Sequence, residues 1–190
     1  MKNLILTMTI LAIVFGCQHS HEHTHEDQPK EKAELYDYDV EARITDMGIT
    51  LSEPPAPVAN YVNAVRTGNL VFMAGKGPNL PEGGYVTGKL GETLTVEEGY
   101  EAAKLVAQAQ LSALKAEIGD LNKVVRIVKV LGMVNCAPDF ANQPEVINGF
   151  SDTMVEVFGD RGKHARAAVG MASLPRNIAV EIEMIVEVQD

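Results

Sequence analysis

The sequence predicts one α+β domain of about 149 residues, over residues 42–190, with elements in the order β-β-α-β-α-β-β. Three observations predict this class. A glycine-containing turn joins two short apolar runs, two longer segments carry apolar residues at helical spacing, and the chain ends in two runs with strand-like alternation. The 190-residue chain is 46% hydrophobic and 22% charged, which is typical of a folded protein.

The first elements follow from turn and proline signals. A short helix is expected over residues 40–47. Residues 52–57 must be extended, because each proline disfavours the helical conformation in the residue before it. Residues 61–66 and 70–74 flank a short loop containing Gly68, and this pattern predicts a β-hairpin. Residues 75–91 are rich in glycine and proline and are expected to form a loop.

Two helices are predicted from their ends and their periodicity. Thr95 and Glu98 form a capping-box pattern, and Gly119 is a suitable helix terminator. The apolar stripe between them comprises Tyr100, Ala103, Ala107, Leu111, Leu114 and Ile118. A second helix begins near Pro144 and ends at Gly159.

Residues 124–134 predict a strand that is apolar on both faces and therefore buried on both sides. Alternation assigns Val124, Val128 and Val130 to one face, and Val125, Ile127 and Leu131 to the other. Because two helices can cover only one face of the sheet, we expect a second copy of the chain to cover the other.

Residues 165–171 and 179–188 predict two final strands. Alternation places Arg166 on one face with the small residues Ala168 and Gly170, which leaves space beside its guanidinium. The last strand carries Glu181, Glu183 and Glu187 on one face, so a solvated acidic face with Arg166 paired across it is an alternative interpretation. We expect Cys136 to be a small buried residue and His164 to be a surface residue.

The N-terminus predicts export. Lys2 precedes a 12-residue apolar run at residues 4–15, the length of a secretory signal rather than a membrane span. Gly16-Cys17 resembles a bacterial lipoprotein box. We therefore expect residues 1–16 to be removed and Cys17 to be lipidated, which would anchor an exported protein to a membrane. A signal peptide that is cut elsewhere is the alternative.

Residues 17–41 predict a disordered tether. Residues 18–41 carry eight acids and two lysines, more than half of the net charge of −10. His19, His21, His23 and His25 alternate there and could bind a transition metal loosely, although a solvated tether is the favoured interpretation. An acidic chain argues against a nucleic-acid partner, because phosphate contacts need clustered lysines and arginines.

The C-terminal strands carry a specific resemblance. Residues 164–183 read His-Ala-Arg-Ala-Ala-Val-Gly-Met-Ala-Ser-Leu-Pro-Arg-Asn-Ile-Ala-Val-Glu-Ile-Glu, which resembles the C-terminal signature of the RidA/YjgF family. That signature has an arginine at a strand start, a Leu-Pro turn and a Glu-Ile-Glu strand. Pro57, Tyr61 and residues 74–76 agree, and the likeness covers residues 56–188.

The resemblance implies a chorismate-mutase-like fold, a homotrimer with clefts between subunits, and no cofactor. It implies hydrolysis of reactive 2-enamine or 2-imine acids, such as 2-aminoacrylate, to 2-keto acids and ammonia. Arg166 would bind the substrate carboxylate bidentately, and Glu181 would orient the attacking water and could deprotonate it. Tyr61, the backbone of Gly75 and Asn148 would complete the cleft.

The chain also departs from the family pattern. Ala74, Lys76 and Ala168 stand where the family usually has serine, glutamine and often cysteine. A non-catalytic, membrane-tethered module that binds small carboxylates or keto acids is therefore the second hypothesis. A metal-scavenging protein that uses the histidine tract is the third.

Overall fold

The structure is a computed structural model, and it describes residues 34–54 and 59–189. The main elements are α1 (Val40–Asp46), β1 (Ala64–Thr67), β2 (Leu70–Lys76), α2 (Val96–Ile118), β3 (Val124–Asn135), α3 (Gln143–Phe158), β4 (Ala165–Met171) and β5 (Val180–Val188). Three short 3-10 segments, at Leu121–Lys123, Gly159–Gly162 and Pro175–Asn177, complete the order. The predicted α+β class and the β-β-α-β-α-β-β order are confirmed, and α1 confirms the short helix expected over residues 40–47.

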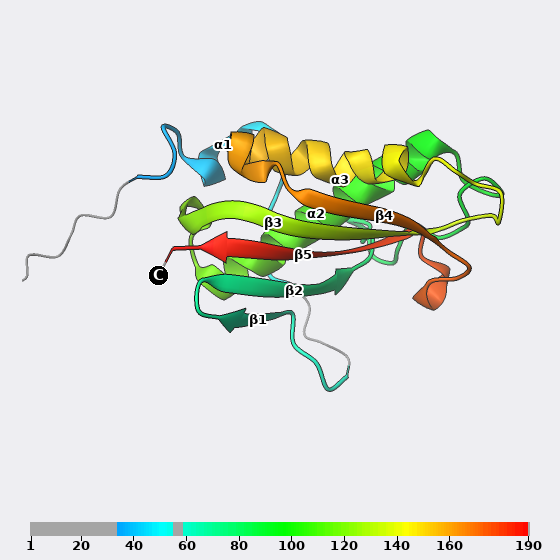
Figure 1. Cartoon of the computed structure of the whole chain (residues 1–190), viewed down its shortest axis with the longest axis horizontal. Helices are drawn as coiled ribbons and strands as arrows, with labels where there is room; N and C mark the ends of the chain where they lie inside the picture. The colour runs from blue at the N-terminus through cyan, green and yellow to red at the C-terminus, as the bar shows by residue number, and fades with distance from the viewer. Residues whose placement is uncertain (1–33, 55–58, 190) are drawn as a thin grey trace, which may run out of the picture. The chain divides into compact units, whose positions relative to one another are not determined.

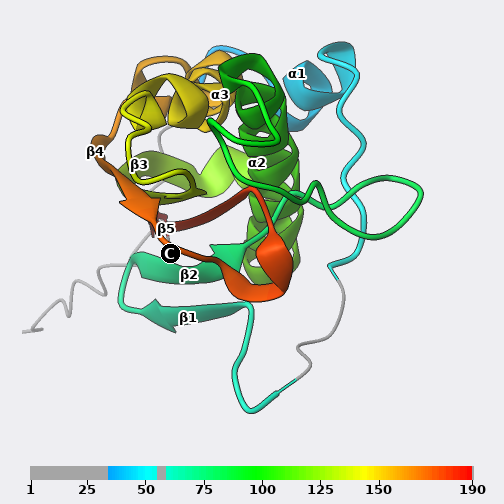
Figure 2. The same ribbon diagram turned by 90° about the vertical axis from the view of Figure 1, so that its right-hand side faces the viewer.

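The five strands form one mixed sheet in the order β1-β2-β5-β3-β4 (Figure 1). Strands β3 and β4 are parallel and are joined by α3, whereas the other neighbouring pairs are antiparallel. Figure 2 looks along the strands and shows α2 and α3 on the same side of the sheet. The buried core lies between these two helices and the strands, and β4 is left at a sheet edge.

The helices end where local chemistry predicts. The Thr95 side chain accepts a hydrogen bond from the Glu98 N–H, and the Glu98 carboxylate accepts one from the Thr95 N–H. Gly119 caps the other end of α2 with a φ of +78°. Gly149 lets α3 approach α2 closely, because a Cβ there would lie 2.1 Å from the carbonyl oxygen of Tyr100.

Strand β3 corrects the predicted face of Ile127. The pairing of β3 with β5 shifts between Val124 and Arg126 and again between Ile127 and Lys129. These irregularities turn Ile127 to the helix side, where it is buried with Val124 and Val130. The prediction that β3 is buried on both sides is also wrong for the single chain, since the residues on its other face are only half-buried.

The folded part of the chain begins upstream of the predicted start at residue 42. The Tyr36 hydroxyl donates a 2.6 Å hydrogen bond to the carbonyl of Val124, and the Tyr38 hydroxyl donates one of 3.0 Å to Val157. Asp39 caps α1 by accepting from the N–H of Ala42. The predicted signal peptide, Cys17 and the histidine tract lie outside the described residues.

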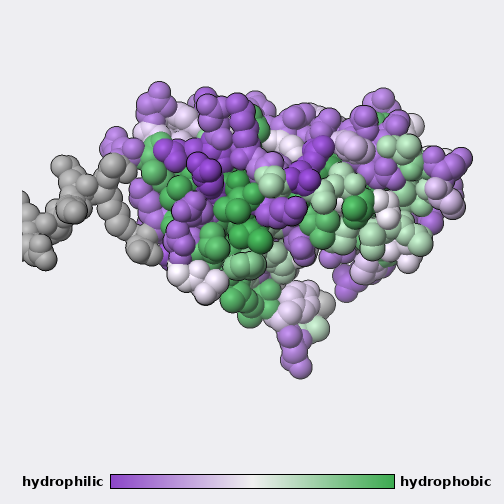
Figure 3. All heavy atoms as spheres, in the orientation of Figure 1, coloured by the Kyte–Doolittle hydropathy of each residue, from purple (hydrophilic) through white to green (hydrophobic). Residues whose placement is uncertain are grey.

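The hairpin begins later than predicted, at Ala64, so Tyr61 precedes the first strand. Gly68, with a φ of +58°, stands in the turn between the two strands. The sheet face opposite the helices carries exposed apolar side chains, including Val65, Phe72 and Val169. Figure 3 shows hydrophobic residues gathered over the strands on the face turned to the viewer. No helix within residues 34–54 and 59–189 is long and apolar enough to cross a membrane.

Candidate active site

Arg166 faces the helix layer from the edge strand β4. It pairs with Val130 of β3, which pairs with Met184 of β5, and both of these partners are buried under the helices. Arg166 Nη1 donates to Asn148 Oδ1 at 2.9 Å and to Ser151 Oγ at 3.0 Å, both on α3. These two neutral acceptors hold the guanidinium without neutralising its charge. The space predicted beside Arg166 is therefore partly filled by the polar side of α3.

His164 extends this network and is not the simple surface residue that the sequence predicts. Its Nδ1 lies 2.7 Å from the carbonyl oxygen of Gly162, so Nδ1 carries the proton in the neutral ring. Its Nε2, 3.1 Å from Ser151 Oγ, then accepts from the serine hydroxyl, which leaves that oxygen free to accept from Arg166. Burial lowers the pKa of His164, and the nearby Arg166 charge lowers it further.

Glu181 lies on the open face of the sheet, at a hollow of about 640 Å³ that Tyr61 and Gly75 also line. Gly75 lies beneath this carboxylate, and a Cβ there would lie 2.4 Å from Glu181 Oε1, so a larger residue would have to displace the end of the Glu181 side chain. Burial raises the pKa of Glu181, and the like charge of Glu183 adds to this effect. We call this cavity the Glu181 hollow.

A buried glutamine, Gln110, binds the two strands beside the Glu181 hollow. The pairing of β2 with β5 is irregular between Met73 and Lys76, which interrupts the regular ladder at Gly75. Gln110, fully buried on α2, donates its amide hydrogens to the carbonyls of Ala74 at 2.9 Å and Ile182 at 2.8 Å. This side chain therefore satisfies backbone groups where the strands separate, and it stabilises the strand conformation around Gly75.

The Glu181 hollow is also lined by Tyr85 and Arg176, which no pattern in the sequence assigned to a site. Arg176 Nη1 donates to the Tyr85 hydroxyl at 3.3 Å, and its guanidinium carbon lies 5.9 Å from the centre of that ring. Arg176 and Asn177 have φ values of +57° and +58°. The Leu-Pro-Arg-Asn turn was visible in the sequence, but the return of the 77–91 loop to this turn was not.

The predicted site residues form two groups on opposite faces of the sheet. Arg166 and Asn148 lie on the helix side, whereas Tyr61, Gly75 and Glu181 surround the hollow on the open side. Glu181 pairs with Met133, three residues beyond the Val130 partner of Arg166. Two strand spacings and three residues correspond to roughly 14 Å between their Cα atoms. The alternative that Arg166 pairs across the acidic face of β5 is therefore wrong.

The residues that the structure describes include no group of three or more histidine, cysteine, aspartate or glutamate side chains placed to hold a metal ion. Cys136 is buried, as predicted, and accepts a 3.6 Å contact from Gln143 Nε2. The site residues on the two faces of the sheet therefore offer a guanidinium held in place at Arg166, a carboxylate with a raised pKa at Glu181, and hydroxyl groups beside both.

Comparisons with known proteins identify the family of the chain. Residues 41–188 match the family described as "YjgF/chorismate_mutase-like, putative endoribonuclease". Protein TCP17 of Trypanosoma cruzi is 43% identical over 152 residues, which cover 80% of this chain and 95% of that protein. A 2-iminobutanoate/2-iminopropanoate deaminase of Dermatophagoides farinae is 30% identical over 136 residues, covering 71% and 91% respectively.

Solved structures show the same fold. The protein Atu1372 of Agrobacterium tumefaciens, of unknown function, is 42% identical with a TM-score of 0.74, over 79% of this chain and 92% of that one. A protein of Shewanella oneidensis is 28% identical with a TM-score of 0.76, over 80% and 100%. The match over nearly the whole folded part and these relatives establish that the chain belongs to the YjgF/chorismate-mutase-like family.

Proposed function

We propose that this protein hydrolyses 2-imino acids, and their 2-enamine tautomers of the 2-aminoacrylate type, to 2-keto acids and ammonia. The reaction would take place in clefts of a homotrimer, where Arg166 and Asn148 of one copy face Tyr61, Gly75 and Glu181 of the next. The separation of the two groups on opposite sheet faces is the observation that carries this proposal, because one chain cannot apply both to one small substrate.

Arg166 is suited to bind the substrate carboxylate. Nη1 is committed to Asn148 and Ser151, and Nη2 makes one long contact of 3.4 Å with the carbonyl of Pro144. The Nη2 and Nε edge of the guanidinium is therefore the edge that would bind a carboxylate. A bidentate interaction there would orient the imine carbon toward the partner copy.

Glu181 is suited to act on water. A carboxylate whose pKa is raised toward neutrality is a better general base than an ordinary glutamate. In the proposed reaction Glu181 takes a proton from water as its oxygen bonds to the protonated imine carbon, which forms a carbinolamine. Transfer of that proton from Glu181 to nitrogen allows the carbon–nitrogen bond to break, while Glu181 takes the proton of the carbinolamine hydroxyl, so that ammonia is released and the keto acid is left.

The direct test is release of ammonia and keto acid from 2-aminoacrylate that is generated enzymatically. We expect wild-type protein to accelerate release and Arg166→Ala to return it to the spontaneous rate, because carboxylate binding is lost. Arg166→Lys, which keeps the charge without the planar fork, is the matched control and should retain an intermediate rate. Wild-type protein that does not exceed the spontaneous rate would exclude the proposal.

The second candidate is a carboxylate-binding module without turnover. It is favoured by Ala74, Lys76 and Ala168 at positions that differ from the family pattern, while the Arg166 network is complete. Calorimetry with pyruvate, 2-ketobutyrate and benzoate distinguishes the two candidates. Binding that depends on Arg166 in a protein without deaminase activity would support this second function.

The N-terminal sequence supports the proposal that the protein is exported and anchored to a membrane through a lipid on Cys17. We expect Cys17→Ala protein to leave the membrane fraction if Cys17 is lipidated. Deletion of residues 18–27 tests metal uptake by the histidine tract, and unchanged uptake would dismiss that role. Both experiments are independent of the deaminase assay.

A further inference from the structure

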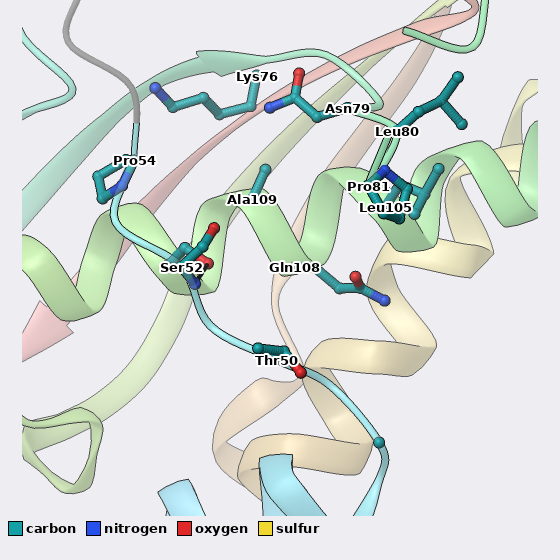
Figure 4. A pocket seen from close by; sticks show the side chains of 12 residues that line it. Thr50, Ser52, Pro54, Lys76, Asn79, Leu80, Pro81, Leu105, Gln108 and Ala109 are labelled. Atoms are coloured by element: carbon teal, nitrogen blue, oxygen red, sulfur yellow. Dashed lines mark hydrogen bonds between the residues drawn. The ribbon is translucent and has the colours of Figure 1, made fainter. Parts of the chain in front are cut away.

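A second cavity lies on the helix side of the sheet, with a volume of about 500 Å³. We call it the α2 pocket (Figure 4). It is lined by the 48–54 segment, by α2 and by the chain that follows β2. The twelve lining residues are Gly48, Thr50, Ser52, Pro54, Lys76, Asn79, Leu80, Pro81, Leu105, Gln108, Ala109 and Ser112. Its volume is within the usual range of small-molecule sites.

The 48–54 segment and one face of α2 form the walls of this pocket. Gly48, at a φ of +74°, follows α1, and the next residues run over α2. Ile49 and Leu51 pack against the core, so the intervening residues face the pocket instead. The Ser52 N–H donates to Ser112 Oγ at 3.3 Å, which ties this segment to the helix. On α2, the lining residues from 105 to 112 follow i, i+3, i+4, i+7 spacing and form one stripe.

Lys76 gives the α2 pocket its charge. Among the twelve described lining residues it is the one charged side chain, and the others offer hydroxyl groups, amides and apolar carbons. Its amine donates to Asn63 Oδ1, a neutral acceptor. Burial lowers the pKa of Lys76, and no carboxylate among the described lining residues compensates its charge. A bound anion would supply that compensation.

We propose that the α2 pocket binds a small monocarboxylate with a short aliphatic chain. The carboxylate would interact with the Lys76 ammonium, and the chain would contact Pro54 and Ala109, which Figure 4 shows nearer to the ammonium than Leu80, Pro81 and Leu105. One lysine matches one negative charge, and the apolar wall disfavours a fully hydrated ion such as inorganic phosphate. The α2 pocket adjoins the Glu181 hollow, because Lys76 and Asn79 line both cavities, but Arg166 and Glu181 do not line it.

The test is a nuclear magnetic resonance titration of the full chain with butanoate, compared with butanamide and inorganic phosphate. We expect butanoate to shift the amide signals of Thr50, Ala109 and Ser112 saturably, and the two other compounds to leave them unchanged. Lys76→Gln should weaken this binding about tenfold, the loss of one charge-assisted contact of about 1.4 kcal/mol. Arg166→Ala should leave these shifts intact.

Three results would overturn the proposal: equal shifts with butanamide, unchanged affinity in Lys76→Gln, or loss of the shifts in Arg166→Ala. The third would place butanoate at the proposed active site instead. Ala109→Leu provides a second check, because it fills the pocket without changing its charge. It should abolish the butanoate shifts while thermal unfolding remains cooperative, and wild-type affinity in this variant would contradict the assignment.

Discussion

Arg166 and Glu181 face opposite sides of one sheet, with β3 between the strands that carry them. Arg166 is bound to α3 through Asn148 and Ser151, whereas Glu181 covers Gly75 on the face without helices. Neither side chain can cross the sheet to reach the other. A reaction that uses both residues must therefore combine surfaces of two copies of the chain.

This arrangement predicts complementation between inactive variants. Co-assembled Arg166→Ala and Glu181→Gln chains should form some clefts with an intact Arg166 from one copy and an intact Glu181 from the next. Random mixing in a trimer leaves about a quarter of the clefts intact, so about a quarter of wild-type ammonia release is expected. The measurement compares co-expressed, differently tagged chains with each variant alone. No recovery in verified mixed trimers would show that each cleft takes both residues from one chain.

Glu181→Gln should stabilise the protein at neutral pH. The pKa of Glu181 is raised in the folded state, chiefly by burial, so ionisation at pH 7 costs folding free energy that the amide does not. This difference should disappear below the ordinary glutamate pKa of 4.5, where the side chain is protonated in both states. Urea unfolding at pH 7 and pH 4 measures it. Glu183→Gln, at an exposed position on the same face, should change stability less, and equal effects would contradict this explanation.

His164 should make stability fall in mild acid. Its folded pKa lies below the ordinary value of 6.5, so the unfolded chain takes up the proton first. The stability present above pH 6.5 is therefore lost as the pH falls toward and through the folded pKa. His164→Gln should lose less unfolding free energy than wild type between pH 7.5 and 5.5. The histidine tract is common to both proteins and cancels, so parallel pH profiles would refute a role for His164.

Gln110→Leu should destabilise the fold by about 1–3 kcal/mol, because a buried and a half-buried carbonyl lose their donors, and this loss exceeds the gain from removing Gln110 Oε1, which has no hydrogen-bond partner among the described residues. Those carbonyls, of Ala74 and Ile182, lie where β2 and β5 separate beside the Glu181 hollow. Gln108→Leu, a half-buried position on the same helix, is the matched control and should stay within about 0.5 kcal/mol. Chemical denaturation measures both variants. Similar stability of the two leucine variants would remove Gln110 from this structural role.

The sequence predicted the side of the sheet shared by Arg166, Ala168 and Gly170, because β4 is regular and simple alternation holds along it. Ile127 was assigned to the wrong side, because strict alternation takes no account of the exposed charged residues Arg126 and Lys129, which lie where the pairing of β3 with β5 is irregular. Helix ends were the most accurate expectation, since the Thr95 capping box and Gly119 are local signals.

The missed parts of the site depend on distant contacts. Ser151 lies on α3 and contacts His164 and Arg166 only because α3 packs beside β4. The 77–91 loop returns to the 175–178 turn through a bridge between Thr87 and Ile178, which brings Tyr85 to Arg176. Residue spacing within a single segment cannot predict these contacts, because each joins segments that are distant in the sequence.

The turn before β5 carries a conformational cost that a glycine would avoid. Arg176 and Asn177 stand consecutively in the left-handed region, which is unfavourable for a long side chain such as arginine by about 1–2 kcal/mol. For Asn177 a hydrogen bond offsets this cost, since its Oδ1 accepts from the side-chain amide of the buried Asn135. Arg176 instead places a guanidinium at the rim of the Glu181 hollow, beside Tyr85. The strain thus marks Arg176 as a residue whose side chain is retained at the expense of a relaxed backbone.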